Sequence, residues 1–577
     1  MQYLSKWIPA VTWLRHYTRA NLLNDGLAAV IVTIMLIPQS LAYALLAGLP
    51  AEMGLYASIF PLIAYAFFGS SRTLSVGPVA VASLMTASAI GSVTASGTAD
   101  YATAATTLAF LGGLMLVTLG LFKFGFVANF LSHPVVSGFI TASGVIIALG
   151  QIGPLVGIPL RGDNLVALLA TLHQHMHQAH LLTAVVGCSS LLFLLLARFA
   201  LPRLLELLGW SARATSLITR SAPVLMMLVV IPLSMILDFD ARTVPIVGAV
   251  PSGLPIFSSP LVSWDLITEL AIPAFLIALI GFVESVSVGK TLGAKKRERI
   301  NANQELVALG AANTAAALSG GFPVTGGFSR SAVNFDAGAD TQMASILTAV
   351  GIGVATLFLT PILYFLPKAA LAATIIVAVL SIIDWKILQQ AYRFSTADFA
   401  AVTFTIFITL VAGVELGVLT GVAVSLGLYL YQTSKPHFAV VGQVGTSEHY
   451  RNIERHDVTT YAEILSIRVD ESLYFANAGY LEEIVFDQIS RRPLLSNVIL
   501  MCPAVNMVDM SALDALNEIN GRLSDLDIKL HLSEVKGPVM DALKRSDFLE
   551  KLTGEVFLSH HAAVTQVRLK MHTRRML

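Results

Sequence analysis

The stretch Ser319-Gly-Gly-Phe-Pro-Val-Thr-Gly-Gly-Phe-Ser-Arg-Ser-Ala-Val-Asn334 decides the fold of this chain. It places four glycines, a proline and Arg330 between segments that are apolar enough to lie in a membrane. Hydrocarbon admits broken backbone and a guanidinium only where both line a cavity enclosed by protein. The stretch therefore predicts either a loop at the membrane surface, with Arg330 reaching the headgroups, or the start of a half-helix that faces a bound anion.

The composition around this stretch is that of a membrane protein with several spans. Of the 577 residues, 55% are hydrophobic and 12% are charged, and the mean hydropathy is +0.74, whereas about a quarter of the residues of a soluble domain are charged. About fourteen apolar runs, the first at 24–46 and the last at 416–434, approach the ~20 residues that a spanning helix needs. We therefore expect an all-α membrane domain at 1–435.

The chain changes character after Lys435. Charged residues become more frequent, and short strands alternate with amphipathic helices, which is typical of an α/β domain with a central sheet. Residues 436–577 are thus expected to form a soluble domain. Most Lys and Arg between the apolar runs fall on the side of the N-terminus, so the N-terminus and the soluble domain are expected in the cytoplasm. The expected location is the cell inner (cytoplasmic) membrane, in contact with membrane lipid.

A second interrupted segment, Val76-Gly-Pro-Val-Ala-Val-Ala-Ser-Leu-Met85, resembles the opening stretch. Pro78 and Pro323 are 245 residues apart, and so are two polar side chains inside apolar runs, Gln39 and Glu284. We expect each proline to lie in the first turn of a helix. The shared offset predicts an internal repeat of seven spans, and this odd number inverts the second copy. Interrupted segments at matching places in inverted halves indicate a transporter's binding site near the middle of the membrane.

The electrostatics of two facing half-helices favour an anion. Their free N–H groups and positive dipole ends would converge on one point. Each end stabilises a negative charge by about 0.3–1 kcal/mol when exposed and up to ~2 kcal/mol when partly buried, while a charge at the bilayer centre costs about 2.5–3.5 kcal/mol. Two ends with Arg330 can offset the dehydration of a small inorganic or organic anion, and two ends alone cannot.

Glu284 is the other charged residue well inside an apolar run. Burial in a medium of low dielectric constant favours the neutral carboxylic acid, so Glu284 is a candidate proton carrier. Two other interpretations stay open: a structural ion pair with Arg330, and a sodium site to which Ser285 and Ser287 contribute.

Several other classes of protein are not indicated. Cys188 and Cys502 build no disulfide framework and show no metal-ligand spacing, and the histidines at 173–180 are those of a solvated loop. The net charge of zero, without a basic stripe, argues against nucleic-acid binding. No nucleophile–base pair or phosphate-binding glycine loop is found, so we expect no enzyme, no cofactor and no metal.

Several motifs resemble those of the SulP family of sulfate-permease anion transporters, whose animal relatives include prestin. The most specific is Ile37-Pro-Gln-Ser-Leu-Ala-Tyr-Ala-Leu-Leu-Ala-Gly-Leu-Pro50; Phe282-Val-Glu-Ser285 and Phe328-Ser-Arg-Ser-Ala-Val-Asn334 are also typical, and the resemblance covers nearly the whole chain. It implies about fourteen helices in a 7+7 inverted repeat, the plan shared with uracil permeases, with a core domain that moves against a gate domain. It also implies a C-terminal STAS domain and a homodimer.

The resemblance also implies roles for individual residues. In the family the anion lies between the third and tenth helices, and Glu284 matches an acidic residue of bacterial members that is associated with proton or sodium coupling. The family often has an aromatic residue where this chain has Val79, so channel-like behaviour based on an aromatic pair is not implied. Carried over residue by residue, the substrate contacts are Gln39, Tyr43, Val79, Ala80, Phe328, Ser329 and Arg330.

The segment Asp509-Met-Ser511 lies where STAS proteins that act as anti-sigma-factor antagonists carry a phosphorylated serine. Ser511 is therefore a candidate regulatory phosphosite. The residues themselves also allow a simpler interpretation, in which Ser511 caps a helix with Asp514 at the third position.

The sequence thus predicts a secondary-active anion transporter that takes up sulfate or a similar small anion with protons, by alternating access. The alternatives are bicarbonate or a dicarboxylate as substrate, sodium as the coupling ion, and a passive anion channel. Two further alternatives are a nucleobase permease with the same repeat plan and a signalling protein whose STAS domain binds a partner.

Overall fold

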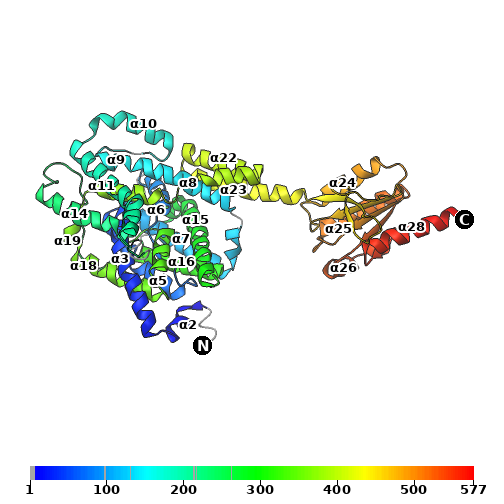
Figure 1. Cartoon of the computed structure of the whole chain (residues 1–577), viewed down its shortest axis with the longest axis horizontal. Helices are drawn as coiled ribbons and strands as arrows, with labels where there is room; N and C mark the ends of the chain where they lie inside the picture. The colour runs from blue at the N-terminus through cyan, green and yellow to red at the C-terminus, as the bar shows by residue number, and fades with distance from the viewer. Residues whose placement is uncertain are drawn as a thin grey trace. The chain divides into compact units, whose positions relative to one another are not determined.

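The computed structural model of the chain (Figure 1) describes residues 7–95, 99–129, 132–160, 162–211, 215, 218–260 and 263–576. Contacts between residues divide it into two compact units, Met1–Ser425 and Leu426–Leu577. Helix α23 (Val414–Ser434) crosses this boundary, and the division expected at 435 falls directly after it.

The first unit is helical, apart from two very short strands described below. Among its described helices, seven are long and apolar enough to cross a membrane, by length and composition, and five more are apolar but shorter. The elements are α2 (Ala10–Arg15), α3 (Arg19–Leu46), α4 (Ala51–Tyr56), α5 (Phe60–Phe68), α6 (Ala80–Ala95), α7 (Tyr101–Leu121), η1 (Phe124–Asn129), α8 (His133–Gly150), α9 (Ile152–Val156), α10 (Leu165–His175), η2 (Met176–Gln178), α11 (Leu181–Phe199), α12 (Leu201–Leu207), α14 (Ala222–Ile236), α15 (Trp264–Lys296), α16 (Ala302–Leu318), α17 (Phe328–Asp336), α18 (Met343–Phe358), α19 (Thr360–Leu363), α20 (Lys368–Val379), α21 (Lys386–Phe394) and α22 (Thr396–Ala412).

Local sequence explains where the long helices begin and end. The side chain of Thr18 accepts a hydrogen bond from the backbone of Asn21, and the Asn21 side chain reciprocates, so a capping box starts α3. At α15 the Ser263 side chain accepts the backbone N–H of Leu266, a single capping bond, and the helix ends where Arg297 adopts a left-handed conformation.

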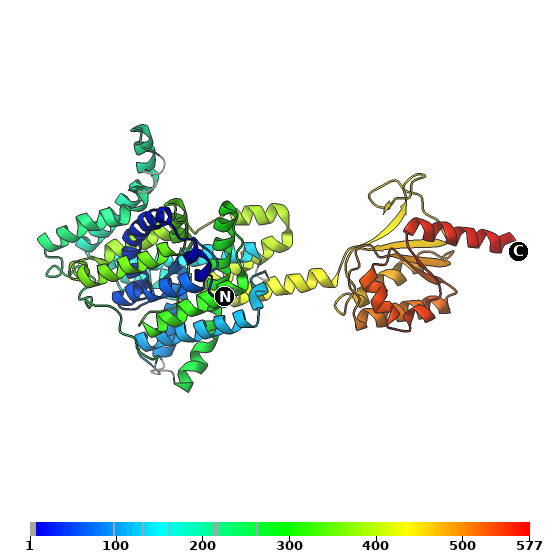
Figure 2. The same ribbon diagram turned by 90° about the horizontal axis from the view of Figure 1, so that it is seen from below.

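The helices pack as two bundles. In the first bundle α16 packs on α7 and α5, α15 packs on α7, and α18 and α17 pack on α3. In the second bundle α11 packs on α20 and α14, and α22 packs on α8. Contacts between α20 and α3 and between α6 and α8 join the bundles. Figures 1 and 2 show α7, α15 and α16 side by side.

Two details of the predicted half-helices are wrong. Helix α6 begins at Ala80, after Pro78, and α17 begins at Phe328, five residues after Pro323, so neither proline lies in a first helical turn. Two short strands lie beside the prolines: β1 (Val76–Gly77) ends directly before Pro78, and β2 (Thr325–Gly326) lies between Pro323 and α17. Proline has no N–H to donate, and both prolines flank these strands instead of lying in them.

The second unit is an α/β domain with a six-stranded sheet in the order β4-β3-β5-β6-β7-β8. Strands β5 to β8 run parallel, while β3 pairs antiparallel with both β4 and β5. Figure 2 shows α28 on one face of the sheet and α24 to α27 on the other. The elements are β3 (Phe438–Gln443), β4 (Tyr450–Asn452), β5 (Ile464–Val469), α24 (Ala478–Ser490), β6 (Asn497–Met501), α25 (Met510–Asp525), β7 (Lys529–Ser533), α26 (Gly537–Lys544), α27 (Phe548–Lys551), β8 (Val556–Phe557) and α28 (His560–Met576).

The cap of α25 differs from the predicted one. The side chain of Asp509, not that of Ser511, accepts the backbone N–H of Ala512, at 2.9 Å, and its other oxygen accepts the N–H of Phe475. A carboxylate satisfies two donors here, which a hydroxyl in the first turn could not reach. Ser511 is exposed in that first turn.

Two buried histidines make this domain sensitive to acid. Desolvation lowers the pKa of His531 and of His560 to about 4. The Nδ1 atom of His531 accepts the backbone N–H of Glu555 at 2.9 Å, and Nδ1 of His560 lies 2.8 Å from Oγ of Ser533. Protonation would turn the His531 acceptor into a donor facing an N–H group.

We therefore expect the sheet and α28 to lose stability as the pH falls. The folded-state pKa values lie below the value of 6.5 for a free histidine, so the unfolded chain binds more protons between pH 6.5 and pH 4. The loss from pH 7 to pH 5 should be about 2 kcal/mol for each histidine. Hydrogen exchange of the α28 amides in the full chain, corrected for intrinsic rates, measures it. Protection that is independent of pH, or unchanged in its pH dependence by His531→Asn, contradicts this account.

Candidate functional site

The two interrupted segments meet in the middle of the first unit. Val76 pairs with Gly326 and Gly77 pairs with Thr325 in an antiparallel ladder, the orientation that inversion of one half relative to the other requires. Helix α6 leaves this ladder at Ala80 and α17 leaves it at Phe328. The ladder therefore joins the starts of two half-helices that lie far apart in the sequence.

Side chains from neighbouring helices hold the ladder in place. Oγ of Ser285 on α15 accepts the N–H of Gly326 at 2.8 Å and donates to the carbonyl of Gly281 at 2.6 Å. The amide side chain of Asn313 on α16 both donates to the carbonyl of Val324 and accepts its N–H, each at 2.9 Å. These bonds satisfy backbone groups that hydrocarbon could not.

The helix starts leave donors free. The first intrahelical bond of α6 runs from the N–H of Ser83 to the carbonyl of Val79, and that of α17 runs from the N–H of Ser331 to the carbonyl of Gly327. The N–H groups of the first turn therefore lack acceptors within their own helices, and α17 has no side-chain cap. Both ends carry the positive part of the helix dipole.

Arg330 lies across the ladder and is 2% exposed. Its Nη2 donates to the carbonyl of Thr325 at 3.3 Å, and its buried Nη1 has no hydrogen-bond partner. A methyl group added at Gly77 would collide with Nη1, and one added at Gly327 would lie 3.0 Å from Nε and Nη2. The two glycines thus make room for the guanidinium beside both helix starts.

All the predicted substrate-binding and proton-coupling residues line one cavity of about 50 Å³ at this point, whereas Ser511 lies in the second unit. By this measure one water needs about 10–15 Å³, so the cavity has room for roughly four waters, comparable with a small oxyanion. Its other lining residues come from the helix starts and from the end of α20. The predicted members are Gln39, Tyr43, Val79, Ala80, Glu284, Phe328, Ser329 and Arg330.

The polar groups of this central cavity are incompletely paired. Oε1 of Gln39 is buried without a hydrogen-bond partner. Glu284 is partly exposed, and no ion pair within 4.0 Å joins it to Arg330 in the described part of the chain. A structural ion pair of Glu284 with Arg330, one of the interpretations left open by the sequence, is therefore not formed in this conformation.

Sequence reasoning missed the contribution of α20 and the segment after it. Ala378, Val379, Ser381 and Ile382 close the cavity opposite the helix starts. Their segment is a plain apolar run without glycine interruption or charge, so no local signal marks it. Ser285, considered as a sodium ligand, uses its hydroxyl for the ladder and does not line the cavity.

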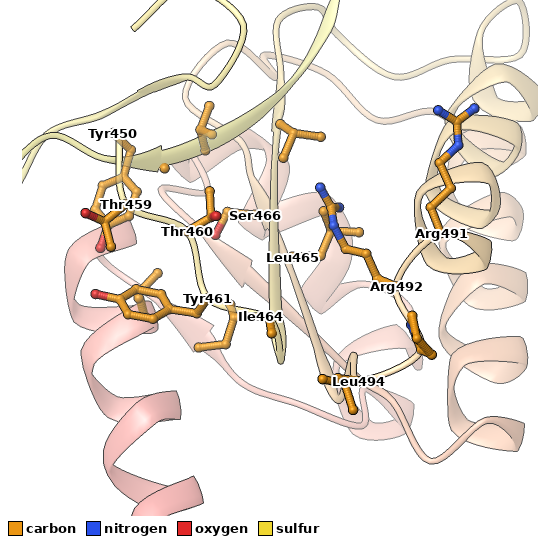
Figure 3. Close-up of a pocket in the computed structure, with 16 residues that line it drawn as sticks. Tyr450, Thr459, Thr460, Tyr461, Ile464, Leu465, Ser466, Arg491, Arg492 and Leu494 are labelled. Carbon is orange, nitrogen blue, oxygen red and sulfur yellow. The ribbon is translucent and has the colours of Figure 1, made fainter. Parts of the chain in front are cut away.

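The second unit has a separate cavity of about 440 Å³, shown in Figure 3. It lies beside β3 and β5, with Tyr450 and Tyr461 on one side and Arg492 on the other. Nη1 of Arg492 is buried without a partner, and desolvation lowers the pKa of this guanidinium. None of the predicted site residues lies there.

Known protein families match both units of this chain. A profile of the sulfate permease family matches residues 22–405, and a profile of the STAS domain matches residues 455–563. The chloroplastic sulfate transporter 4.1 of Arabidopsis thaliana is 34% identical over 99% of this chain and 84% of its own length. A probable sulfate transporter of Mycobacterium tuberculosis is 32% identical over 97% of this chain and 98% of its own length.

Solved structures show the same fold. SLC26A9 superimposes with a TM-score of 0.89 at 23% identity, over 100% of this chain and 95% of that chain. The transmembrane domain of the cyanobacterial bicarbonate transporter BicA gives 0.59 at 21% identity, over 71% of this chain and 99% of that chain. The predicted family, the mostly helical membrane fold and the STAS domain are confirmed, and the relatives are transporters, not enzymes. The chain therefore belongs to the sulfate permease family, as a multi-pass membrane anion transporter with a C-terminal STAS domain.

Proposed function

We propose that this protein takes up sulfate, or a small oxyanion like it, together with protons by alternating access. The observation that carries the proposal is the central cavity, where an unpartnered guanidinium nitrogen of Arg330, two helix starts and the carboxyl group of Glu284 meet. Sulfate is proposed because relatives that match along nearly the whole chain are named sulfate transporters.

The anion would bind between the two helix starts. Free N–H groups of the first turns and the positive dipole ends attract negative charge, and Nη1 of Arg330 supplies a charge-assisted hydrogen bond. The hydroxyl of Ser329 and the amide of Gln39 are further groups in the lining. Because the oxyanion pairs donors that are otherwise unsatisfied, occupancy lowers the cost of carrying this site through the membrane.

The proton would be carried by Glu284. This carboxyl group lines the same cavity as Arg330 without forming an ion pair with it, so its charge is not neutralised by contact. An ionised Glu284 repels an incoming anion, and a neutral one does not. Anion and proton are therefore expected to bind together. Sodium coupling would need a set of oxygen ligands, and the lining supplies one carboxylate with scattered hydroxyl and amide groups.

The same proposal includes the setting of the protein. The N-terminus and the STAS domain lie in the cytoplasm, the membrane is the inner membrane of the cell, and two copies form a homodimer. Lipid surrounds the apolar helices, and Ser511, exposed at the start of α25, is open to phosphorylation. Movement of one bundle relative to the other opens the site to each side of the membrane in turn.

Uptake of labelled sulfate into proteoliposomes tests the function. Sulfate should accumulate when an inward proton gradient is imposed, and a protonophore should abolish the accumulation. An inward sodium gradient at equal pH is the control for the alternative coupling ion, and labelled bicarbonate and succinate test the other substrates. If the rate of sulfate uptake does not depend on the proton gradient, proton coupling is contradicted. Ionic currents far larger than a carrier's turnover allows would indicate a channel.

A further inference from the structure

A second, wider cavity lies next to the central one. Its volume is about 350 Å³, and it shares Gln39, Phe328 and Ser329 with the central cavity. It is built at the end of α11 and the start of α14, on the side that the topology assigns to the cytoplasm. An anion moving between the cytoplasm and Arg330 would pass through it.

The charged lining of this wider cavity is entirely basic among the described residues. Arg198 and Arg220 line it, and no Asp or Glu does. Nη1 of Arg198 donates to the carbonyl of Val377 at 2.6 Å, so the position of this side chain is fixed. Asp336, which does not line the cavity, forms an ion pair with Arg220, so the two arginines and this carboxylate leave one net positive charge at the wall, which favours an anion.

Two polar atoms at its wall have no hydrogen-bond partner among the residues that the structure describes. Arg220 uses Nη2 for an ion pair with Oδ2 of Asp336 at 2.7 Å, but its Nη1 is buried without a hydrogen bond. Oγ1 of the adjacent Thr219 is also buried without one. If the Arg220–Asp336 ion pair were only structural, Nη1 of Arg220 and Oγ1 of Thr219 would stay unsatisfied, which costs folding free energy. A bound oxyanion would accept a hydrogen bond from both groups.

We infer that Thr219, Arg220 and Arg198 form a second site that binds an oxyanion before or after it occupies the central cavity. The inference deepens the proposed function and rests on it for the identity of the ligand, sulfate. Affinity at this site is expected to be the weaker of the two, because the cavity is wider and Arg220 is shared with Asp336. The site would raise the local concentration of anion beside Arg330.

The carboxylate of Asp336 would compete with a bound oxyanion for the guanidinium of Arg220. Asp336 ends α17 in the first bundle, and Arg220 lies two residues before α14 in the second bundle. A bound oxyanion and this carboxylate share one guanidinium, so binding weakens the contact between the bundles. Removing the carboxylate should therefore strengthen anion binding, while removing the arginine should weaken it.

Equilibrium binding of labelled sulfate to the full chain in phosphatidylcholine nanodiscs tests the inference. The wild type should show two classes of site, and Arg330→Ala should keep only the weaker one. Arg220→Gln should weaken that class about tenfold, the size of one lost charge-assisted hydrogen bond. Asp336→Asn should tighten it, with a change of roughly threefold. Arg203→Gln, an exposed arginine of α12 that does not line the cavity, is the matched control.

The possible results distinguish failure of the second site from failure of the proposed transport function. A single class of site in the wild type, or a weaker class that Arg220→Gln and Asp336→Asn change in the same direction, overturns the second site and leaves transport untouched. Loss of the weaker class when phosphatidylglycerol is added assigns the site to a lipid phosphate and also overturns it. If two classes of site are found but uptake does not depend on the proton gradient, only the proton coupling is contradicted. If no sulfate binds at all, both the second site and sulfate transport are overturned.

Discussion

Arg330→Ala is expected to reduce sulfate uptake at least about a hundredfold, the factor that corresponds to the ~3 kcal/mol of a strong hydrogen bond to a charged group. Arg330 is the one basic residue among the described residues that line the central cavity. Its removal leaves two helix starts, each worth at most about 2 kcal/mol for a unit negative charge. Initial rates in proteoliposomes at several sulfate concentrations measure the loss, and sulfate binding to the purified variant shows whether it arises at the binding step.

The fold of this variant should be intact. Arg330 is 2% exposed and one of its nitrogens is unpaired, so its removal relieves a buried charge instead of breaking a network. The melting temperature without substrate should be unchanged or higher. Gly77→Ala is the companion variant, since the added methyl group would collide with Nη1 while the arginine stays in place. Normal uptake by Arg330→Ala would exclude the guanidinium as the anion ligand.

Glu284→Gln should separate anion binding from proton coupling. Glutamine resembles the neutral acid in size and charge, so the loaded site still forms, but it cannot release a proton. We expect the stimulation of uptake by a proton gradient to disappear. With one coupled proton and no membrane voltage, a gradient of one pH unit drives at most about tenfold accumulation. Exchange of internal for external sulfate should continue, because both halves of that cycle use the loaded site.

The comparison needs an acidic residue outside the cavity. Glu269 lies on the same helix, α15, is exposed and does not line the central cavity, so Glu269→Gln should keep both uptake and its proton dependence. If Glu284→Gln retained the stimulation, the proton would travel by another group. If it lost exchange as well as net uptake, Glu284 would be a ligand or a packing residue instead of a proton carrier.

Several residues of the candidate site could be found from the sequence because they stand out in local patterns. Glycine and proline interrupted two apolar runs, and charge or amide groups stood where hydrocarbon excludes them, so Gln39, Glu284 and Arg330 could be found one at a time. The antiparallel inversion of two segments then required them to meet. The structure places them in one cavity, as this reasoning predicted.

What sequence reasoning missed was decided by tertiary contacts. The two-residue strands β1 and β2 are too short to show alternation, and each exists only because the other is opposite. Ser285 and Asn313 look like ordinary polar residues of helices, yet they hold the ladder through backbone groups many residues away. Strand β4 of the STAS domain has three residues and lies at the sheet edge, so the sequence carries no alternation that would reveal it.

If Glu284 carries the proton as proposed, the presence of Arg330 and Glu284 in one small cavity also sets how much charge crosses the membrane in each cycle. With a sulfate dianion bound and Glu284 neutral, the site and its cargo carry one net negative charge, whereas the empty site with Glu284 ionised carries none. Uptake would then move negative charge against an interior-negative voltage, at about 2.3 kcal/mol per 100 mV, while a tenfold proton gradient supplies only about 1.4 kcal/mol. A monovalent anion would cross without this penalty. The membrane voltage therefore becomes a selector of substrate valence, acting on a site whose affinity alone would favour the dianion.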